Sequence, residues 1–267
     1  MPSPVLLKFG GSILHGPDDV ARAARCVQAE LARGARVVAV TSAFRGRTDA
    51  LEASLVQLGE ESGRPPTPHE RAALLATGEL ETIRLLLAEL EAAGVRAALA
   101  DVREVGPFVE PGTERPTRLD AARLLALFEL ADVVCLPGFV AAEDTTDAGP
   151  ALLGRGGSDM TALFAGHALG ARVKLVKDVE GLFATDPSMA PIAGAHRSEE
   201  PEPLATLDFD AALELGPTVL QPAAVRFARS IGFGFEVVGP EHFETDGAAR
   251  PGTSVGGRRA AGSTPTE

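Results

Sequence analysis

Near its N-terminus the chain reads Pro4-Val5-Leu6-Leu7-Lys8-Phe9-Gly10-Gly11-Ser12, an apolar run that carries one lysine and leads into a glycine pair. This pattern predicts a buried strand over residues 4–9 and a helix over 17–33. A strand, a glycine turn and a helix direct backbone N–H groups at one point, which suits a phosphate. Taken alone, the glycine pair fits a plain tight turn equally well, and it matches neither the P-loop nor the Gly-x-Gly-x-x-Gly spacing.

A second cluster lies in the middle of the chain, at Leu153-Gly154-Arg155-Gly156-Gly157-Ser158-Asp159. The Arg155 guanidinium can pair with a carboxylate through two hydrogen bonds, and the glycines let a ligand approach the backbone. Ser158 is predicted to be the N-cap of the next helix, at an end where free N–H groups favour anions. The cluster suits a small zwitterion whose carboxyl group meets a phosphate donor, and the alternative is an ordinary capped loop.

The rest of the chain alternates between strand-like and helix-like segments. This alternation predicts an α/β protein, a three-layer α/β/α sandwich with a mostly parallel central sheet. Three segments rich in proline, glycine or polar residues, at 60–68, 113–116 and 143–150, are predicted to be loops. The strands are expected at 4–9, 36–41, 95–100, 132–137, 172–177 and 234–239, and the helices at 17–33, 69–92, 117–130, 158–169, 206–215 and 222–230.

Length and composition fit one enzyme-sized domain. The chain has 267 residues, of which 45% are hydrophobic, and a formal net charge of −12. This acidic balance argues against a nucleic-acid partner. We see no signal peptide, no apolar run of about 18 residues that would cross a membrane, and no metal-binding cluster, so we expect a cytoplasmic protein without a membrane partner or a resident metal. A domain over 1–246 and a flexible C-terminal tail over 247–267 are expected.

The two motifs together resemble the amino acid kinase family, and within it the catalytic domain of aspartate kinases. The Arg-Gly-Gly-Ser-Asp element carries most of the likeness to aspartate kinases, whereas the Asp-Val-x-Gly and Asp-Pro elements occur across the family. Further matching segments follow in the same order along the chain: Val38–Ala43 with Thr48-Asp49, Leu75–Glu79, Pro137-Gly138-Phe139, Lys177–Phe183 with Thr185-Asp186-Pro187, Leu215–Pro222 and Arg250–Thr253.

This resemblance implies an activity: transfer of the γ-phosphoryl group of ATP to the side-chain carboxylate of L-aspartate, giving 4-phospho-L-aspartate. That reaction opens the synthesis of the aspartate-family amino acids lysine, threonine and methionine. Mg²⁺ would arrive with the ATP phosphates rather than in a protein-built cage. The family also implies a homodimer. Aspartate kinases usually continue into regulatory ACT domains, and the short segment after Thr253 predicts none here.

The resemblance further assigns roles to individual residues. Arg155 would bind the α-carboxylate of the substrate, Glu79 would accept from its α-ammonium, and Asp159 would orient Lys8. The alternatives without a functional role are a surface carboxylate for Glu79 and core packing for Phe183. The catalytic set is Lys8, Gly10, Gly11 and Asp159; the substrate set is Ser42, Glu79, Arg155, Gly157 and Ser158; the nucleotide set is Ser12, Lys177, Asp178, Phe183, Asp186 and Thr218.

The chain departs from the family pattern at three nucleotide-contact positions. Thr218 stands where the family has a lysine that contacts ATP phosphates, Lys177 where it usually has threonine, and Phe183 where it usually has tyrosine. Losing one such donor is worth ~2–4 kcal/mol of transition-state stabilisation. We hypothesise that Lys177 replaces the missing charge. Two alternatives stay open: a family enzyme that acts on another small carboxylate, phosphate or carbamate, and a nucleotide- or metabolite-binding protein with weak or no catalysis.

Overall fold

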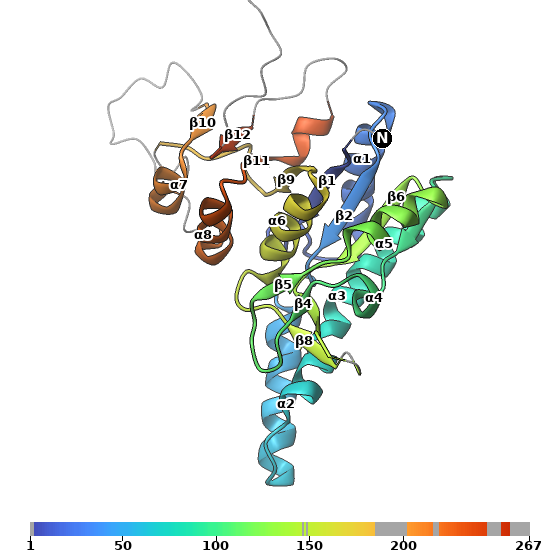
Figure 1. Cartoon of the computed structure of the whole chain (residues 1–267), viewed down its shortest axis with the longest axis vertical. Coiled ribbons are helices and arrows are strands. Elements are labelled where there is room, and N and C mark those ends of the chain that lie inside the picture. Colours follow the sequence, from blue (N-terminus) through green and yellow to red (C-terminus); the bar gives the residue numbers. More distant parts are fainter. Residues whose placement is uncertain are drawn as a thin grey trace, which may run out of the picture.

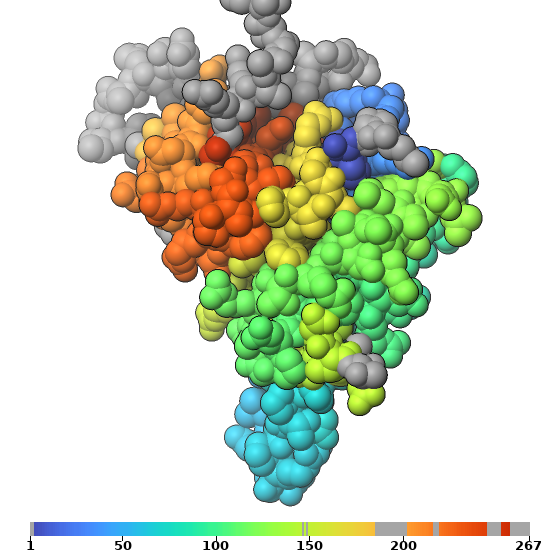
Figure 2. Space-filling view, in the orientation of Figure 1, coloured from blue at the N-terminus to red at the C-terminus, as the bar shows by residue number. Residues whose placement is uncertain are grey.

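The computed structural model describes residues 3–145, 147, 149–184, 202–215, 219–244 and 252–256. A central sheet lies between two layers of helices, and a helical hairpin projects from one end of the molecule (Figure 1). The hairpin consists of α2 (Arg47–Ser62) and the first turns of α3 (Pro68–Ala92), and its narrow tip also stands out in the space-filling view (Figure 2). The molecule is therefore wider at the sheet than at the hairpin.

The central sheet contains eight strands within the described residues, in the order β10-β12-β11-β9-β1-β2-β6-β3. All neighbouring pairs are parallel except β11 with β12. This confirms the predicted mostly parallel sheet. The strands are β1 (Val5–Phe9), β2 (Val37–Thr41), β3 (Ala97–Leu99), β6 (Val133–Pro137), β9 (Arg172–Val176), β10 (Thr206–Leu207), β11 (Phe235–Val238) and β12 (Thr253–Val255).

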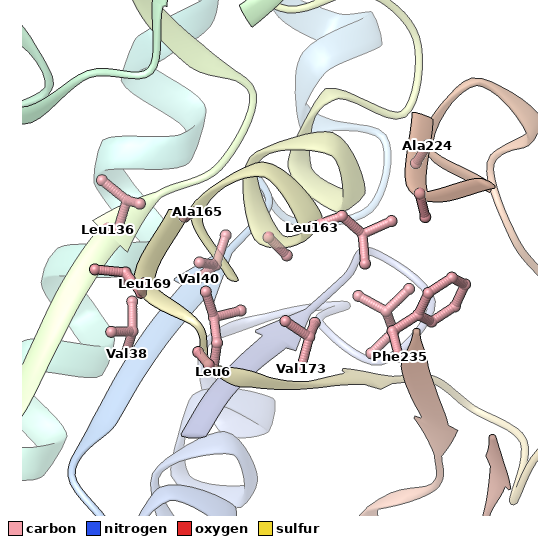
Figure 3. Packing of buried hydrophobic residues seen from close by; sticks show 14 of the residues in the cluster. Leu6, Val38, Val40, Leu136, Leu163, Ala165, Leu169, Val173, Ala224 and Phe235 are labelled. Atoms are coloured by element: carbon pink, nitrogen blue, oxygen red, sulfur yellow. The ribbon is translucent and has the colours of Figure 1, made fainter. Parts of the chain in front are cut away.

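Both faces of this sheet are apolar, because its central strands are buried on each side. On one face Leu6, Val38 and Val173 pack with Leu163 and Ala224 in a cluster shown in Figure 3. That face is covered by α5 (Ala121–Ala126), η1 (Leu127–Glu129), α6 (Gly157–Leu169), α7 (Phe209–Leu215) and α8 (Pro222–Ile231).

On the opposite face a second cluster contains Leu7, Phe9 and Val27 and is covered by α1 (Pro17–Ala32), α3 and η2 (Pro240–Phe243). The alternation of side chains along each strand thus sends neighbouring residues into different helical layers. The predicted three-layer α/β/α sandwich is confirmed.

A smaller four-stranded sheet, in the order β5-β4-β7-β8, lies beside the projecting hairpin. Its strands are β4 (Phe108–Val109), β5 (Pro116–Arg118), β7 (Val140–Glu143) and β8 (Pro150–Leu152), and a single helical turn, α4 (Val102–Val105), precedes it. Here the prediction of a helix over 117–130 is wrong at its start, because residues 117 and 118 pair with β4 instead. The helix forms only from Ala121, after an N-cap at Asp120.

Two further boundaries differ from the prediction, again because the residues form strands that pair within a sheet. The predicted helix over 206–215 begins at Phe209, because Thr206 and Leu207 form β10 and pair with β12. Strand β12 itself falls inside the predicted tail, and its Thr253 and Val255 are fully buried. Residues 252–256 therefore belong to the sheet, while the domain boundary at residue 246 stays a prediction.

Candidate active site

A buried ionic cluster lies where β1 and β9 end. Lys8 Nζ is 2.5 Å from Asp159 Oδ1, and Lys177 Nζ is 2.9 Å from Asp159 Oδ2. The two lysines come from neighbouring parallel strand ends, and Asp159 comes from the first turn of α6. All three residues are at most 5% exposed. The structure therefore brings together Lys8 and Asp159, as predicted, and adds Lys177 to the same carboxylate.

The charges in this cluster depend on one another. Burial pushes the pKa of Asp159 upward, but Lys177 and Lys8 outweigh it and hold that pKa well below its usual range. Burial also lowers the pKa of Lys8, an effect that Asp159 opposes and that the like charge of Lys177 reinforces. Such a group is stable only while the opposite charges remain in contact. Asp159 is thus placed to orient lysines rather than to accept a proton.

The glycine turn after β1 lies directly above Lys8. A Cβ atom on Gly10 would come within 2.7 Å of Lys8 Nζ, so only glycine leaves room for the ammonium group. Gly11 and Ser12 line a pocket of about 1090 Å³, and so does Ser42, which follows β2. The Ser12 hydroxyl oxygen is buried and has no hydrogen-bond partner among the described residues. The turn therefore presents an unpaired hydroxyl group beside the cations, and a glycine turn of this kind suits a phosphate.

The same pocket contains the two residues predicted to bind the acceptor. Arg155 is exposed and forms no ion pair with another described residue. Glu79, in α3, is 3% exposed, and its Oε2 atom has no hydrogen-bond partner among the described residues. The pocket thus holds a guanidinium that is open to an anion and a carboxyl group with one unpaired oxygen.

The pKa of the Glu79 carboxyl group is unusually high. Burial raises its pKa to about 8, although the charge of Lys8 and a hydrogen bond to the Ala43 backbone act in the opposite direction. Near neutral pH burial therefore keeps Glu79 mainly as a neutral acid. A bound cation would favour the ionised form, because an opposite charge at this distance lowers a carboxyl pKa.

The prediction that Ser158 caps α6 is wrong. The N-cap is Gly156, at φ 78°, and Gly157 and Ser158 are the first two helical residues. Both still line the pocket, with their backbone N–H groups in the unpaired first turn of the helix. A Cβ on Gly157 would lie 2.6 Å from the ring of Phe139, so glycine lets the helix start against that ring. Phe139 has φ 64°, a strained value for a residue with a side chain.

The nucleotide-contact predictions divide into three groups. Asp178 is exposed and lines the pocket, next to the buried Lys177. Phe183 is half-buried and is not among the residues that line this pocket. Asp186 and Thr218 lie outside the described residues.

The pocket also has an outer wall that sequence reasoning did not assign. Arg71 donates to Glu52 at 2.8 Å, which links α3 to α2. Glu114 approaches Gly154 from the β4–β5 loop, and a Cβ on Gly156 would collide with the side chain of Gln221. A sequence signal existed for four of these residues, which stand in segments that resemble the family: Thr48, Asp49, Phe139 and Gln221. The residues that this wall adds are Thr48, Asp49, Glu52, Arg71, Glu114, Phe139 and Gln221.

Other kinds of site find no support in the described part of the chain. It contains no group of three or more His, Cys, Asp or Glu residues placed to hold a metal ion. Cys26 and Cys135 are buried free thiols. None of the described helices has the length and apolarity to cross a bilayer.

Comparisons with known proteins show the family to which the chain belongs. The chain is 34% identical to aspartokinase 2 of Bacillus subtilis and 31% identical to the aspartokinase of Mycobacterium tuberculosis, over 87% and 95% of its length. It spans a little over half of each relative, 55% and 57%.

Solved structures give the same result. The aspartate kinase from Synechocystis superposes with a TM-score of 0.74 at 30% identity, covering 95% of this chain and 40% of that one. E. coli aspartokinase III in complex with aspartate and ADP gives a TM-score of 0.71 at 24% identity, over 94% of this chain and 64% of that one, and shows the fold alone. The model of the amino acid kinase family matches residues 3–232. The chain is therefore a member of the amino acid kinase family.

Proposed function

We propose that this protein transfers the γ-phosphoryl group of ATP to the side-chain carboxylate of L-aspartate. The observation that carries the proposal is the pocket with Glu79 and Arg155. One oxygen of the buried Glu79 carboxyl group has no hydrogen-bond partner among the described residues, which costs free energy unless a donor reaches it. The α-ammonium of an amino acid supplies that donor, and its α-carboxylate suits the open guanidinium of Arg155.

The reaction needs no general base. A carboxylate acceptor is ionised at neutral pH, so one of its oxygens attacks the γ-phosphorus directly. A new O–P bond forms, the bond from that phosphorus to the β–γ bridging oxygen breaks, and ADP leaves with the electron pair. In-line placement of two anions requires cations and N–H donors around the phosphoryl group. In this proposal Lys8, the Gly10-Gly11 turn and Ser12 supply them, and Asp159 holds Lys8 in place.

The nucleotide is proposed to bind as its Mg²⁺ complex. The carboxylate of Asp178 faces the pocket and is the kind of oxygen ligand that Mg²⁺ prefers, while the nucleotide phosphates would supply the rest. When bound, the ion neutralises phosphate charge. The homodimer and the lysine, threonine and methionine pathways remain predictions.

Hydroxylamine trapping tests the function directly, because an acyl phosphate reacts with it to give a coloured hydroxamate. The protein, ATP and Mg²⁺ are incubated with L-aspartate, L-glutamate, N-acetylglutamate or no acceptor. We expect product with L-aspartate alone, and its loss in Glu79→Gln. Turnover with another acceptor would replace aspartate as the substrate, and silence with every acceptor in folded protein would favour the non-catalytic alternative.

A further inference from the structure

We propose that Lys177 is a second phosphoryl-binding cation, which contacts the transferred group together with Lys8. This inference deepens the proposed function and rests on it. Lys8 and Lys177 both bond Asp159, at 2.5 and 2.9 Å, so the carboxylate fixes the two ammonium groups on either side of itself. Ser158 precedes Asp159 in the sequence and Asp178 follows Lys177, and both Ser158 and Asp178 line the pocket. The buried cluster therefore lies immediately behind the pocket wall.

The sheet explains why a residue so far along the chain reaches this point. Strands β1 and β9 are parallel neighbours, with Lys8 paired to Leu175 and Phe9 paired to Val176. Continuing this register sets Lys177 beside Gly10, the residue that leaves room for Lys8 Nζ. Alternation along β9 sends Val173, Leu175 and Lys177 toward α6, where Asp159 lies.

The charge of the cluster indicates a missing anion. Two buried lysines share one carboxylate, and among the described residues the other acid near Lys8 is Glu79, which burial keeps mainly neutral near pH 7. A buried excess positive charge costs free energy unless an anion arrives to balance it. The γ-phosphate of ATP carries that charge, and the glycine turn with its unpaired Ser12 hydroxyl group lies at the same place.

Lys174 provides an internal comparison on the same strand. It points to the opposite face, where it donates to Glu30 at 2.9 Å and contacts His242 Nε2 at 2.8 Å. Glu30 also pairs with Arg33, but that guanidinium side chain is 38% exposed and solvated. The buried charge of Lys174 is therefore balanced by Glu30, and Lys174 is not among the residues that line the pocket. It serves as a matched control for the removal of a buried lysine from β9.

The test compares Lys177→Met, Lys177→Arg and the control Lys174→Met with the unchanged protein. Calorimetry measures the affinities for Mg²⁺-ATP and Mg²⁺-ADP, and hydroxamate assays measure kcat and KM. We expect Lys177→Met to weaken ATP binding by about tenfold or more while ADP binding changes little, because only ATP carries the γ-phosphate. We expect kcat to fall by about 10²–10³-fold, the usual effect of removing one transition-state donor. Lys177→Arg keeps the charge and should retain the preference for ATP.

Thermal unfolding distinguishes this role from a structural one. Lys177→Met leaves Lys8 and Asp159 as a balanced pair, so its Tm without nucleotide should equal or exceed that of the unchanged protein. The Lys174→Met control should lose stability and keep its preference for ATP over ADP.

Two results would overturn the proposal: a Lys177→Met protein that keeps its ATP-to-ADP preference, or an unchanged protein that has none. Neither readout depends on the acceptor. A failure of the aspartate assay with intact ATP discrimination therefore rejects the proposed function and leaves the role of Lys177 supported.

Discussion

The charge of Glu79 depends on what occupies the pocket. Its pKa, raised to about 8 by burial, leaves it mainly protonated at pH 7, and a bound ammonium group favours the ionised form. We therefore expect aspartate binding to release close to one proton at pH 7, and the affinity for aspartate to rise with pH until about pH 8. Calorimetry in buffers of different ionisation enthalpy measures the protons released. Binding without proton release would contradict this prediction.

Glu79→Gln is the control, and it also reports on stability. The folded-state pKa is raised above the ordinary value of 4.5, so the stability that the protonated form contributes is complete below about pH 4.5 and is lost as pH rises through about 8. Glutamine cannot ionise. The variant should release no proton with aspartate and should be at least as stable as the unchanged protein at pH 8.5, as urea unfolding can measure.

Arg155 gives a residue-scale prediction of a different kind. It is exposed and unpaired within the described residues, so Arg155→Ala should leave the Tm unchanged. Losing a charge-assisted pair with the α-carboxylate should raise KM for aspartate by about 10- to 100-fold. Arg71→Ala is the matched control, because that guanidinium already pairs with Glu52 at the outer wall. A KM for Arg155→Ala within twofold of the unchanged value would place the α-carboxylate elsewhere.

Among the elements, α6 fixes the position of Asp159, and its seat on β9 depends on Gly166. A Cβ there would collide with Val173 of β9. Gly166→Ala should therefore lower the free energy of unfolding by about 1–3 kcal/mol, the usual cost of overpacking a core. Adding Val173→Ala should recover part of that loss, and urea unfolding of all four proteins in the double-mutant cycle measures the coupling. Strictly additive losses would show that α6 does not rest on Val173.

The same elements show what a sequence can predict. Strands β1, β2, β6 and β9 are mostly apolar runs, and the glycine pair after β1 locates Lys8 from local pattern alone. The strands of the second sheet have only two to four residues each and are too short for a periodic signal. Helix α2 was missed because it buries only Leu51 and Leu55 and exposes Val56 and Leu58.

Part of the candidate site was likewise beyond prediction. Arg155 and Glu79 stand in segments that resemble known motifs, so the sequence alone predicts them as candidates, and both line the pocket. The contact of Lys177 with Asp159 depends on the register between β1 and β9, and the approach of Glu114 and Gln221 depends on how distant loops fold back. These are tertiary relations, which a local pattern does not contain.

At the scale of the whole molecule, the two cysteines report on global unfolding. Cys26 and Cys135 belong to one buried cluster, and burial raises the pKa of each thiol to about 12. A buried, protonated thiol is unreactive, so neither should react with a disulfide reagent in the native state, and both should react in denaturant. ATP should slow any residual labelling, because it stabilises the folded form by mass action. Rapid native-state labelling would show that the sheet opens locally.

Where parallel strands end side by side, a positive charge can reach the same place from more than one strand end. Lys177 reaches Asp159 from the end of β9, whereas Thr218 stands where the resemblance to the family implies a lysine. A position-by-position comparison with the family pattern would count one phosphate-binding cation fewer in this chain. Counting the residues that contact the Asp159 carboxylate gives two cations, Lys8 and Lys177. For proteins built on this sheet, a lost residue therefore becomes a lost function only after the neighbouring strand ends have been counted.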